Sequence, residues 1–297
     1  MPVVVTPADT PVGRALVPLL RESGSEVRAT VGDIDAAEPF RALGAKAAVL
    51  AEPDDDILRA IVDEAHTVCL LSGDLFLPDE ESYEQRIEEW THAVLRAARK
   101  AKVKRVLLVS YPGATSSSSN DFLRSEGRAE DAVRDSSPEH AILRCTHIYG
   151  VGSPWLDFVV RAATRHPAVV VGSGMQRMAP VYAGDVARAL AAADDRASPV
   201  SGTYGLQGPD VVTADELADV LGGSGRPKRH MGADAGSSNV GAGPLGLSWS
   251  PAIGEVLAAD SLAGGPAAEQ EFGLSLTPMA AGLLASDVDA ARSSFHR

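Results

Sequence analysis

The sequence predicts an α/β protein built on a doubly wound parallel sheet, with a small C-terminal α/β cap. Over the first 150 residues, short runs of Val, Ile and Leu alternate with stretches of helical periodicity. The runs are apolar on both faces, which is typical of parallel strands buried between two layers of helices. The chain has 297 residues, of which 45% are hydrophobic, so it is long enough to bury a sizeable core without a metal or a disulfide.

Six strands are expected in the first 150 residues, and each is a short run of mainly aliphatic residues. They cover residues 2–6, 26–31, 46–50, 67–71, 104–110 and 140–146. The helices between them are expected at 12–22, 35–43, 55–64, 80–101 and 120–135. In the fourth of these helices, apolar residues recur at helical spacing, with acidic residues at its start and basic residues at its end. Trp90 belongs to this apolar stripe, which predicts a core position for it.

After residue 150 the spacing of the expected elements changes. The pattern predicts helices at 153–165, 184–194 and 213–221, and strands at 168–171 and 202–206. We therefore expect residues 1–150 to form the core and residues 151–297 a smaller cap region, the two making one integrated structural unit. Residues 222–247 are dense in Gly, Ser and Ala without periodicity, which predicts a mobile loop or a lid over a site.

Charge and cysteine usage exclude several classes of function. With 27 Lys and Arg against 40 Asp and Glu, the net charge is −13, and no dense basic run is present to bind a phosphate backbone. Nucleic acid is therefore not expected as a partner. The apolar runs are too short to span a membrane, and the start of the chain lacks a signal-peptide pattern, so no membrane is expected either. Cys69 and Cys145 lie in expected buried strands, as free thiols do in a reducing compartment, which favours a cytoplasmic protein.

The connection between the first strand and the first helix is where a doubly wound sheet normally binds a phosphate group. The helix N-terminus there offers free N–H groups and the positive end of the helix dipole. In this chain the connection reads Thr6-Pro7-Ala8-Asp9-Thr10-Pro11-Val12-Gly13, with a single glycine. Pro7 fixes φ and removes a donor, while Thr10 carries a Cβ where close approach of a phosphate needs none. Asp9, Thr10 and Pro11 also make a good helix start, which would place a carboxylate where a pyrophosphate binds.

Four further segments follow the patterns of one protein superfamily. Residues 103–110 match the strand pattern V-K-R-x-V-x-V-S, and residues 141–150 match T-I-L-R-P-x-x-x-Y-G with Cys145 in place of the proline. Residues 179–187 match P-V-x-x-x-D-V-A, and residues 202–221 match G-x-x-Y-x-L-x-G-P-x-x-x-T-x-x-E-L-A-x-x-L. In order and spacing the chain resembles the short-chain dehydrogenases/reductases, specifically their atypical, NmrA-like branch, whose first loop reads T-G-A-T-G-x-x-G. The resemblance covers nearly the whole chain and implies a Rossmann-type fold that binds a nicotinamide dinucleotide.

The resemblance also implies which residues would contact that dinucleotide. They are Pro7, Ala8, Asp9, Thr10, Pro11 and Val12 of the first loop, Asp33 after the second strand, Ser72 and Gly73 after the fourth, and Ser110 at the end of the fifth. Relatives whose second strand ends in V-R-D use the Arg for a 2′-phosphate, whereas this chain has Val31-Gly32-Asp33. A dinucleotide retained here would therefore be NAD rather than NADP. The altered first loop also leaves open that no dinucleotide is bound.

The catalytic positions of the family are altered as well. Catalytic members use a Tyr, a Lys four residues further on that lowers the Tyr pKa and holds the ribose, and a Ser that ends the fifth strand. Aligning residues 124–130 with the family segment x-S-K-x-x-x-E sets Phe122 on the Tyr and Glu126 on the Lys. Ser110 is retained. Tyr111 would serve as a relocated phenol and His147 as a proton carrier, although a plain turn and a packed rim residue explain them equally well.

Two functions remain open from the sequence. The first is a divergent pseudoenzyme, a sensor or a regulator with weakened dinucleotide binding, which takes a small molecule between core and cap and has a protein partner. The second is an NAD(P)-dependent oxidoreductase, or an enzyme like a sugar-nucleotide epimerase or dehydratase, that uses Tyr111. The loss of several site residues at once favours the first. The seven His residues lack ligand spacing, so no metal is expected.

Overall fold

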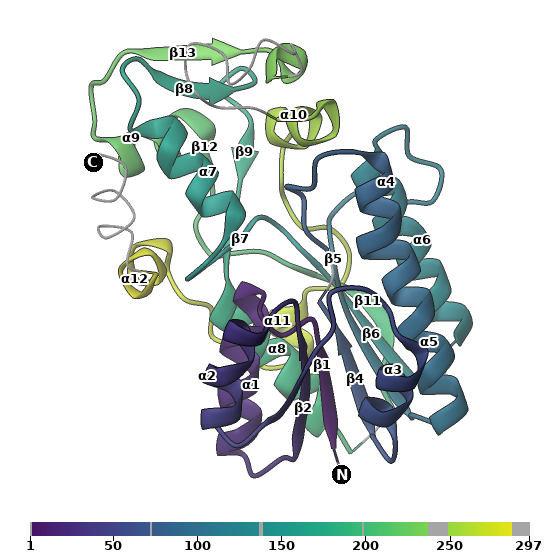
Figure 1. Cartoon of the computed structure of the whole chain (residues 1–297). Coiled ribbons are helices and arrows are strands. Elements are labelled where there is room, and N and C mark those ends of the chain that lie inside the picture. The colour runs from purple at the N-terminus through teal and green to yellow at the C-terminus, as the bar shows by residue number, and fades with distance from the viewer. Residues whose placement is uncertain (1, 72, 137–138, 198, 237–248, 287–297) are drawn as a thin grey trace.

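A computed structural model of the chain has a seven-stranded, fully parallel sheet at its centre (Figure 1). The structure describes residues 2–71, 73–136, 139–197, 199–236 and 249–286. The strands lie in the order β11-β6-β5-β4-β1-β2-β3. The doubly wound parallel sheet predicted from the sequence is confirmed.

Each strand of the sheet begins and ends within one residue of its expected bounds. The strands are β1 (Val3–Thr6), β2 (Val27–Val31), β3 (Lys46–Val49), β4 (Thr67–Leu70), β5 (Arg105–Ser110), β6 (Glu139–Cys145) and β11 (Ser201–Leu206). The chain builds the sheet outward from β1 to β3 and then returns to the other side of β1 with β4. This reversal leaves a crevice at the carboxyl ends of the strands, where ligands of such sheets bind.

Helices cover both faces of the sheet, because neighbouring residues along each buried strand point to opposite faces and both are apolar. Val3 and Val5 point to one face, where α1 (Pro11–Glu22), α2 (Ile34–Ala42) and α8 (Ala183–Asp195) pack. Val4 points to the other face, where α3 (Asp55–Val62), α5 (Trp90–Ala101) and α6 (Asp121–Ser136) pack. Trp90 is buried in this second layer, as its place in the apolar stripe predicted.

A smaller region lies above the carboxyl ends of the strands, at the top of Figure 1. In the described chain it contains the strand pairs β7 (Ile148–Tyr149) with β10 (Val181–Tyr182), β9 (Arg177–Met178) with β12 (Val212–Thr213), and β8 (Ala168–Val171) with β13 (Lys228–Met231). Its helices are α7 (Pro154–Ala163), α9 (Ala214–Gly222), the short η2 (Ala233–Gly236) and α10 (Pro251–Ala258). Further along the chain, α11 (Ala268–Glu271) lies against β11, and α12 (Met279–Ala285) lies against β10.

Three features of the fold differ from the sequence-based expectation. The helix expected at 80–101 is divided into α4 (Glu80–Tyr83), the π-helical η1 (Glu84–Glu89) and α5; such π-helical turns are common at functional sites. Part of the loop expected at 222–247 is instead a strand, β13, which pairs with β8 and binds the backbone groups that an edge strand would leave unpaired. Residues 237–247 lie outside the described residues. Finally, α8 and β11 follow residue 150 in the chain but belong to the main sheet and its helix layers. The predicted boundary at residue 150 stays a prediction.

Two further expectations concern the environment of the protein. Among the described residues, every helix is too short or too polar to reach across a lipid bilayer. Cys69 and Cys145 are both buried as free thiols, and burial raises the pKa of each.

Candidate ligand-binding site

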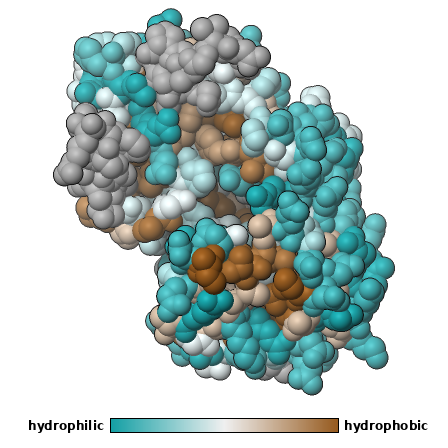
Figure 2. Space-filling model, viewed as in Figure 1, coloured by the Kyte–Doolittle hydropathy of each residue, from teal (hydrophilic) through white to brown (hydrophobic). Residues whose placement is uncertain are grey.

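A cavity of about 410 Å³ lies at the carboxyl ends of the sheet strands, below the smaller region. Figure 2 shows a hollow between the two parts of the molecule, with hydrophobic residues in its walls. The lining comes from the turn between β1 and α1, the 73–77 segment after β4, and the ends of β5 and β6. Gly32 and Leu50, which follow β2 and β3, helices η1, α5 and α6, and residues 152–155 complete it. The cavity therefore lies at the reversal of strand order, where this fold class binds its ligands.

The turn between β1 and α1 forms one wall and caps its own helix. Thr10 is the N-cap of α1: its Oγ1 accepts a hydrogen bond from the Gly13 N–H at 3.1 Å, and Pro11 follows at the first helical position. A Cβ at Gly13 would collide with the carbonyl oxygen of Ala8, so this glycine serves close packing of helix on strand. Because Thr10 occupies one N–H and Pro11 has none, the helix start offers fewer donors to a phosphate than a glycine-rich loop.

The Asp9 carboxylate does not lie at the helix start, which corrects the expectation from the sequence. Its Oδ2 accepts a hydrogen bond from the Gly32 N–H, just after β2, at 2.9 Å. The cap of α1 is Thr10, so the Asp9 side chain is not used there. In a doubly wound sheet the ribose of the adenosine lies at the end of the second strand. The negative charge is therefore at the adenosine end of the cavity.

Two other side chains lie near that end. Asp33, expected to bind a ribose hydroxyl, is exposed, caps α2 by accepting from the Ala36 N–H at 2.8 Å, and does not line the cavity. Arg86 of the π-helical η1 does line it, and its Nη1 donates to the Ala51 carbonyl oxygen beyond β3 at 3.0 Å.

Gly73, which follows β4, packs closely against Glu126 of α6. A Cβ at Gly73 would collide with Glu126 Oε1, so a larger residue here would force this carboxyl group to move. The close approach expected for a cofactor is made here by a side chain of the protein itself. Ser72, the companion of Gly73 in the predicted site, lies outside the described residues.

The hydroxyl of Ser110 belongs to a buried ion-pair network. Ser110 Oγ donates to Glu130 Oε1 at 2.7 Å. Arg144 binds both oxygens of Glu130, at 2.8 and 2.7 Å, and Arg134 binds Oε2 at 2.6 Å. A serine hydroxyl has one proton to donate, and in this structure Ser110 donates it to the protein.

Tyr111 and His147 are part of an aromatic cluster in the inner wall. Tyr111 Oη lies 2.8 Å from Ser261 Oγ and 3.2 Å from His147 Nδ1. The His147 ring stacks on Trp155 with 4.9 Å between ring centroids, and Phe122 meets Tyr111 edge-on at 5.5 Å. Burial raises the pKa of the Tyr111 phenol and lowers the pKa of His147 to about 3. Both groups are therefore neutral at pH 7.

Glu126 is a buried carboxyl group in the wall of the cavity. The residue is 1% exposed, and neither of its carboxyl oxygens has a hydrogen-bond partner among the described residues. Burial raises the pKa of Glu126 to about 8; the nearby Ser110 hydroxyl opposes this effect and the Glu130 carboxylate adds to it. At pH 7 the group is mainly protonated and uncharged.

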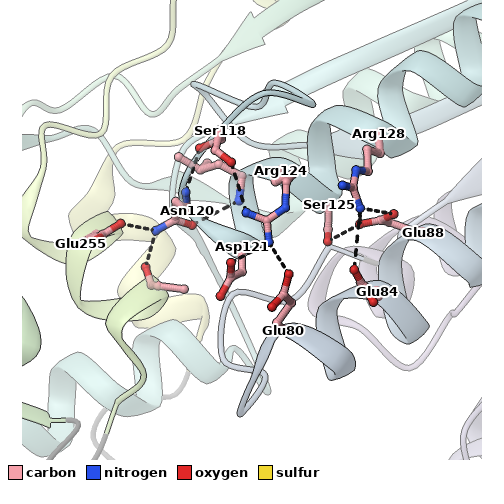
Figure 3. A network of polar contacts seen from close by, with 12 residues as sticks. Glu80, Glu84, Glu88, Ser118, Asn120, Asp121, Arg124, Ser125, Arg128 and Glu255 are labelled. Carbon is pink, nitrogen blue, oxygen red and sulfur yellow. Dashed lines mark hydrogen bonds and ion pairs between the residues drawn. The ribbon is translucent and has the colours of Figure 1, made fainter.

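A network of charged and polar side chains holds the start of α6 against α4, η1 and α10 (Figure 3). Arg124 binds a carboxylate of α4 at 2.6 Å, and Ser125 Oγ donates to Glu88 of η1 at 2.6 Å. Asn120 Nδ2 donates to Glu255 of α10 at 2.8 Å. These contacts fix the position of α6 and with it the side chains that this helix contributes to the cavity.

The structure brings most of the predicted site residues to one cavity. Those that line it are Pro7, Asp9, Thr10, Pro11, Val12, Gly73, Ser110, Tyr111 and His147. Ala8 is buried behind the turn and does not line it. Sequence reasoning did not select Asp74, Phe76, Arg86 and Trp155, because no motif marks them. It noticed Glu126 only as a lost lysine; its spacing of four from Glu130, on the buried side of a helix, was the signal available. Within the described ranges, no group of three or more His, Cys, Asp or Glu is placed to hold a metal ion.

Comparison with known proteins identifies the family. The chain belongs to the NAD(P)H-binding family, whose model matches residues 8–193. Subunit 9 of the NADH dehydrogenase (ubiquinone) 1 alpha subcomplex, a mitochondrial protein of Arabidopsis thaliana, is 31% identical over 221 residues, which are 71% of this chain and 54% of that protein. The Mus musculus protein of the same name is 27% identical over 158 residues, 53% of this chain and 42% of that protein. The chain thus spans about half the length of the curated relatives it matches.

Solved structures with the same fold contain nicotinamide dinucleotides. The triphenylmethane reductase of Citrobacter sp., complexed with NADP(H), superposes with a TM-score of 0.71 at 20% identity, covering 96% of this chain and 99% of that one. The UDP-glucose 4-epimerase of Thermus thermophilus, complexed with NAD, superposes with a TM-score of 0.73 at 17% identity, covering 99% and 100%. At these identities the likeness shows the fold. Together with the family match, it confirms the resemblance to the atypical short-chain dehydrogenases/reductases.

Proposed function

We propose that this member of the NAD(P)H-binding family is a divergent pseudoenzyme, a sensor or regulator that binds a nicotinamide dinucleotide weakly and catalyses no hydride transfer. The observation that carries the proposal is the pair of residues at the Tyr and Lys positions of the family. Phe122 has no proton to give, and Glu126 is a buried carboxyl group without a partner among the described residues. A carboxyl group at the lysine position cannot lower the pKa of a phenol, and when ionised it raises that pKa.

The second candidate function is an oxidoreductase or an epimerase-like enzyme that acts through Tyr111. In its favour, Tyr111 lines the cavity and its hydroxyl lies 3.2 Å from His147. Three features argue against this candidate function. The Tyr111 phenol is hydrogen-bonded to Ser261, burial raises the pKa of the phenol, and His147 is neutral. The Ser110 hydroxyl, which would orient a substrate oxygen, donates to Glu130. We therefore favour the pseudoenzyme.

A bound dinucleotide would follow the rule for doubly wound sheets, with its pyrophosphate at the start of α1 and its adenosine toward the end of β2. The residues of this chain fit that arrangement weakly, because the helix start is capped by Thr10 and carries Pro11. The Asp9 carboxylate at Gly32 would accept a hydrogen bond from a free ribose hydroxyl and repel a 2′-phosphate. NAD is therefore the proposed cofactor in preference to NADP. When bound, it would supply a nicotinamide ring, and the residues of the chain would only hold it.

The proposal extends to partners and location. Two relatives are named as subunits of a larger complex, which supports a protein partner for this chain in addition to a small molecule in the cavity. Both described cysteines are free and buried, which suits a reducing compartment, so we propose a cytoplasmic location. The relatives themselves are mitochondrial.

The test is a calorimetric titration of the purified chain with NAD, NADH, NADP and NADPH, followed by hydride-transfer assays with a panel of carbonyl substrates. We expect weak binding of NAD, weaker binding of NADP, and no turnover. Tight binding of NADP would contradict the cofactor preference. Turnover that is lost in Tyr111→Phe would replace the pseudoenzyme by the second candidate function.

A further inference from the structure

The inner part of the cavity combines carboxyl groups with aromatic walls, and we infer that it binds an organic cation such as an ammonium compound. This inference names the class of small molecule for the cavity in which the proposed function places the dinucleotide, and it rests on that function. The ligand would lie beside Glu126, at the end of the cavity away from Asp9 and Gly32.

Two carboxyl side chains line this part of the cavity without a cation beside them. Neither oxygen of Glu126 has a partner in the described chain, and Asp74 Oδ1 accepts one hydrogen bond, from the Phe76 N–H at 2.8 Å. Among the described lining residues, Arg86 is the only Lys or Arg, and it donates to the Ala51 carbonyl at the adenosine end. A positively charged ligand would therefore lie against a lining that holds the buried Glu126 carboxyl and, among the described residues of this part, no competing cation.

The walls suit a cation that carries methyl or aryl groups. The aromatic lining residues are Phe76, Trp90, Tyr111, Phe122, His147 and Trp155. Faces of Trp, Tyr and Phe attract ammonium and guanidinium groups, most strongly where water is excluded. His147 adds no repulsion, since burial lowers its pKa to about 3 and keeps it neutral. An anionic ligand would find carboxyl groups and no positively charged side chain among the described lining residues of this part.

An unpaired buried carboxyl group is unusual, because buried polar side chains normally have hydrogen-bond partners. The Glu126 carboxyl packs against Gly73 and has no hydrogen-bond partner among the described residues. Glu130, one turn along the same helix, is bonded to two arginines. A ligand cation in the cavity would compensate the charge of the buried Glu126, as the two arginines do for Glu130.

Binding of a cation would be linked to a proton. Burial raises the pKa of Glu126 to about 8, so a cation that favours the ionised carboxylate would displace its proton. The titratable and polar groups around it are Glu130 on α6, Ser110 of β5 and Cys145 of β6. Glu130 is paired with arginine, and burial raises the pKa of the Cys145 thiol, so Glu126 is the group expected to release the proton at neutral pH.

The test uses three probes of similar shape and different charge on the full chain. Benzyltrimethylammonium, benzyl alcohol and benzoate are titrated calorimetrically at pH 8, with and without NAD. We expect the cation to bind at least tenfold more tightly than the alcohol, and benzoate to bind most weakly. Because the charge of the quaternary ammonium does not change with pH, its affinity should rise about tenfold from pH 6 to pH 8 as Glu126 becomes easier to ionise.

The variant Glu126→Gln keeps the shape of the side chain and removes its charge. It should lose about tenfold in affinity for the cation, together with the pH dependence, and bind benzyl alcohol as before. Glu89→Gln, the same change at an exposed position of η1 outside the cavity lining, should behave as the unmodified protein. Equal binding of the three probes, or a cation preference that survives Glu126→Gln, would overturn the inference. If the cation binds and NAD does not, the cavity inference stands and the proposed function fails; NAD binding without cation preference gives the reverse.

Discussion

Glu126 and Glu130 lie one turn apart on α6, both are 1% exposed, and their surroundings are opposite. Glu130 accepts hydrogen bonds from Ser110, Arg134 and Arg144 and joins α6 to β5 and β6. Glu126 lies against Gly73 at the wall of the cavity and has no partner in the described chain. The same residue type, at the same depth, is paired with two arginines at one position and has no hydrogen-bond partner among the described residues at the other.

This difference in surroundings indicates which of the two carboxyl groups is expected to serve function. Removing one member of a buried ion pair leaves its partners without compensation, so Glu130 is retained by stability alone. Glu126 has no such partner to leave behind, and its burial costs stability whenever it ionises. A chain selected for stability alone would replace it by a neutral residue, so its presence in a cavity wall favours a ligand as the reason.

The largest expected effect is that of Glu130→Gln. The change breaks the charge pairs with Arg134 and Arg144 and should lower the free energy of unfolding by about 3–5 kcal/mol. Urea denaturation at pH 7 measures it. A loss below 1 kcal/mol would mean that the network does not hold α6 in place.

The matched change Glu126→Gln should act in the opposite direction. The pKa of Glu126 is raised to about 8 in the folded chain from an ordinary 4.5, so folding is favoured below pH 4.5, where both states hold the proton. This contribution is lost as pH rises from 4.5 to 8, and at pH 7 the loss is on the order of 3 kcal/mol. The variant should therefore be more stable than the unmodified protein at pH 7, by up to that amount, and should lack the slope between pH 5 and pH 8. A loss of stability in both Gln variants would remove the contrast between the two carboxyl groups.

A third prediction separates the altered first loop from the altered dyad. Pro7→Gly restores a backbone donor, Thr10→Gly removes a Cβ, and Asp9→Thr removes a carboxylate at the adenosine end. The triple variant should gain about a hundredfold in affinity for NAD, or roughly 2.7 kcal/mol, measured by calorimetry. Turnover should stay absent because Phe122 and Glu126 are unchanged. Turnover in this variant would show that the loop alone had blocked catalysis.

The smallest expected effect is that of Ser110→Ala. The substitution removes one hydrogen bond to the Glu130 carboxylate, which is worth about 1.5–3 kcal/mol at most, and Glu130 keeps both arginines. Chemical denaturation should show a loss at the low end of that range, with NAD affinity unchanged. If instead NAD affinity falls and stability does not, Ser110 belongs to the ligand site and not to the Glu130 network.

The predicted fold and the predicted site succeeded to different extents. The expected strand at 168–171 matches β8 residue for residue, because a short apolar run between breakers has few other structures open to it. The expected helix at 80–101 missed the π-helical η1, since its periodicity continues through the insertion. Among the predicted site residues, most of the first loop and Tyr111 line the cavity. Asp33 instead caps α2, and the Asp9 carboxylate accepts a hydrogen bond from the Gly32 N–H.

The sequence by itself determined the layers and the strands and predicted the loss of the family dyad, because apolar periodicity and motif spacing act over short stretches of chain. Only the tertiary structure decided which of two similar carboxyl groups is paired. Arg144 of β6 reaches Glu130, and the segment after β4 brings Gly73 onto Glu126; both contacts join residues distant in the sequence. The charge state of a buried group depends on what surrounds it in space, and no local pattern records that.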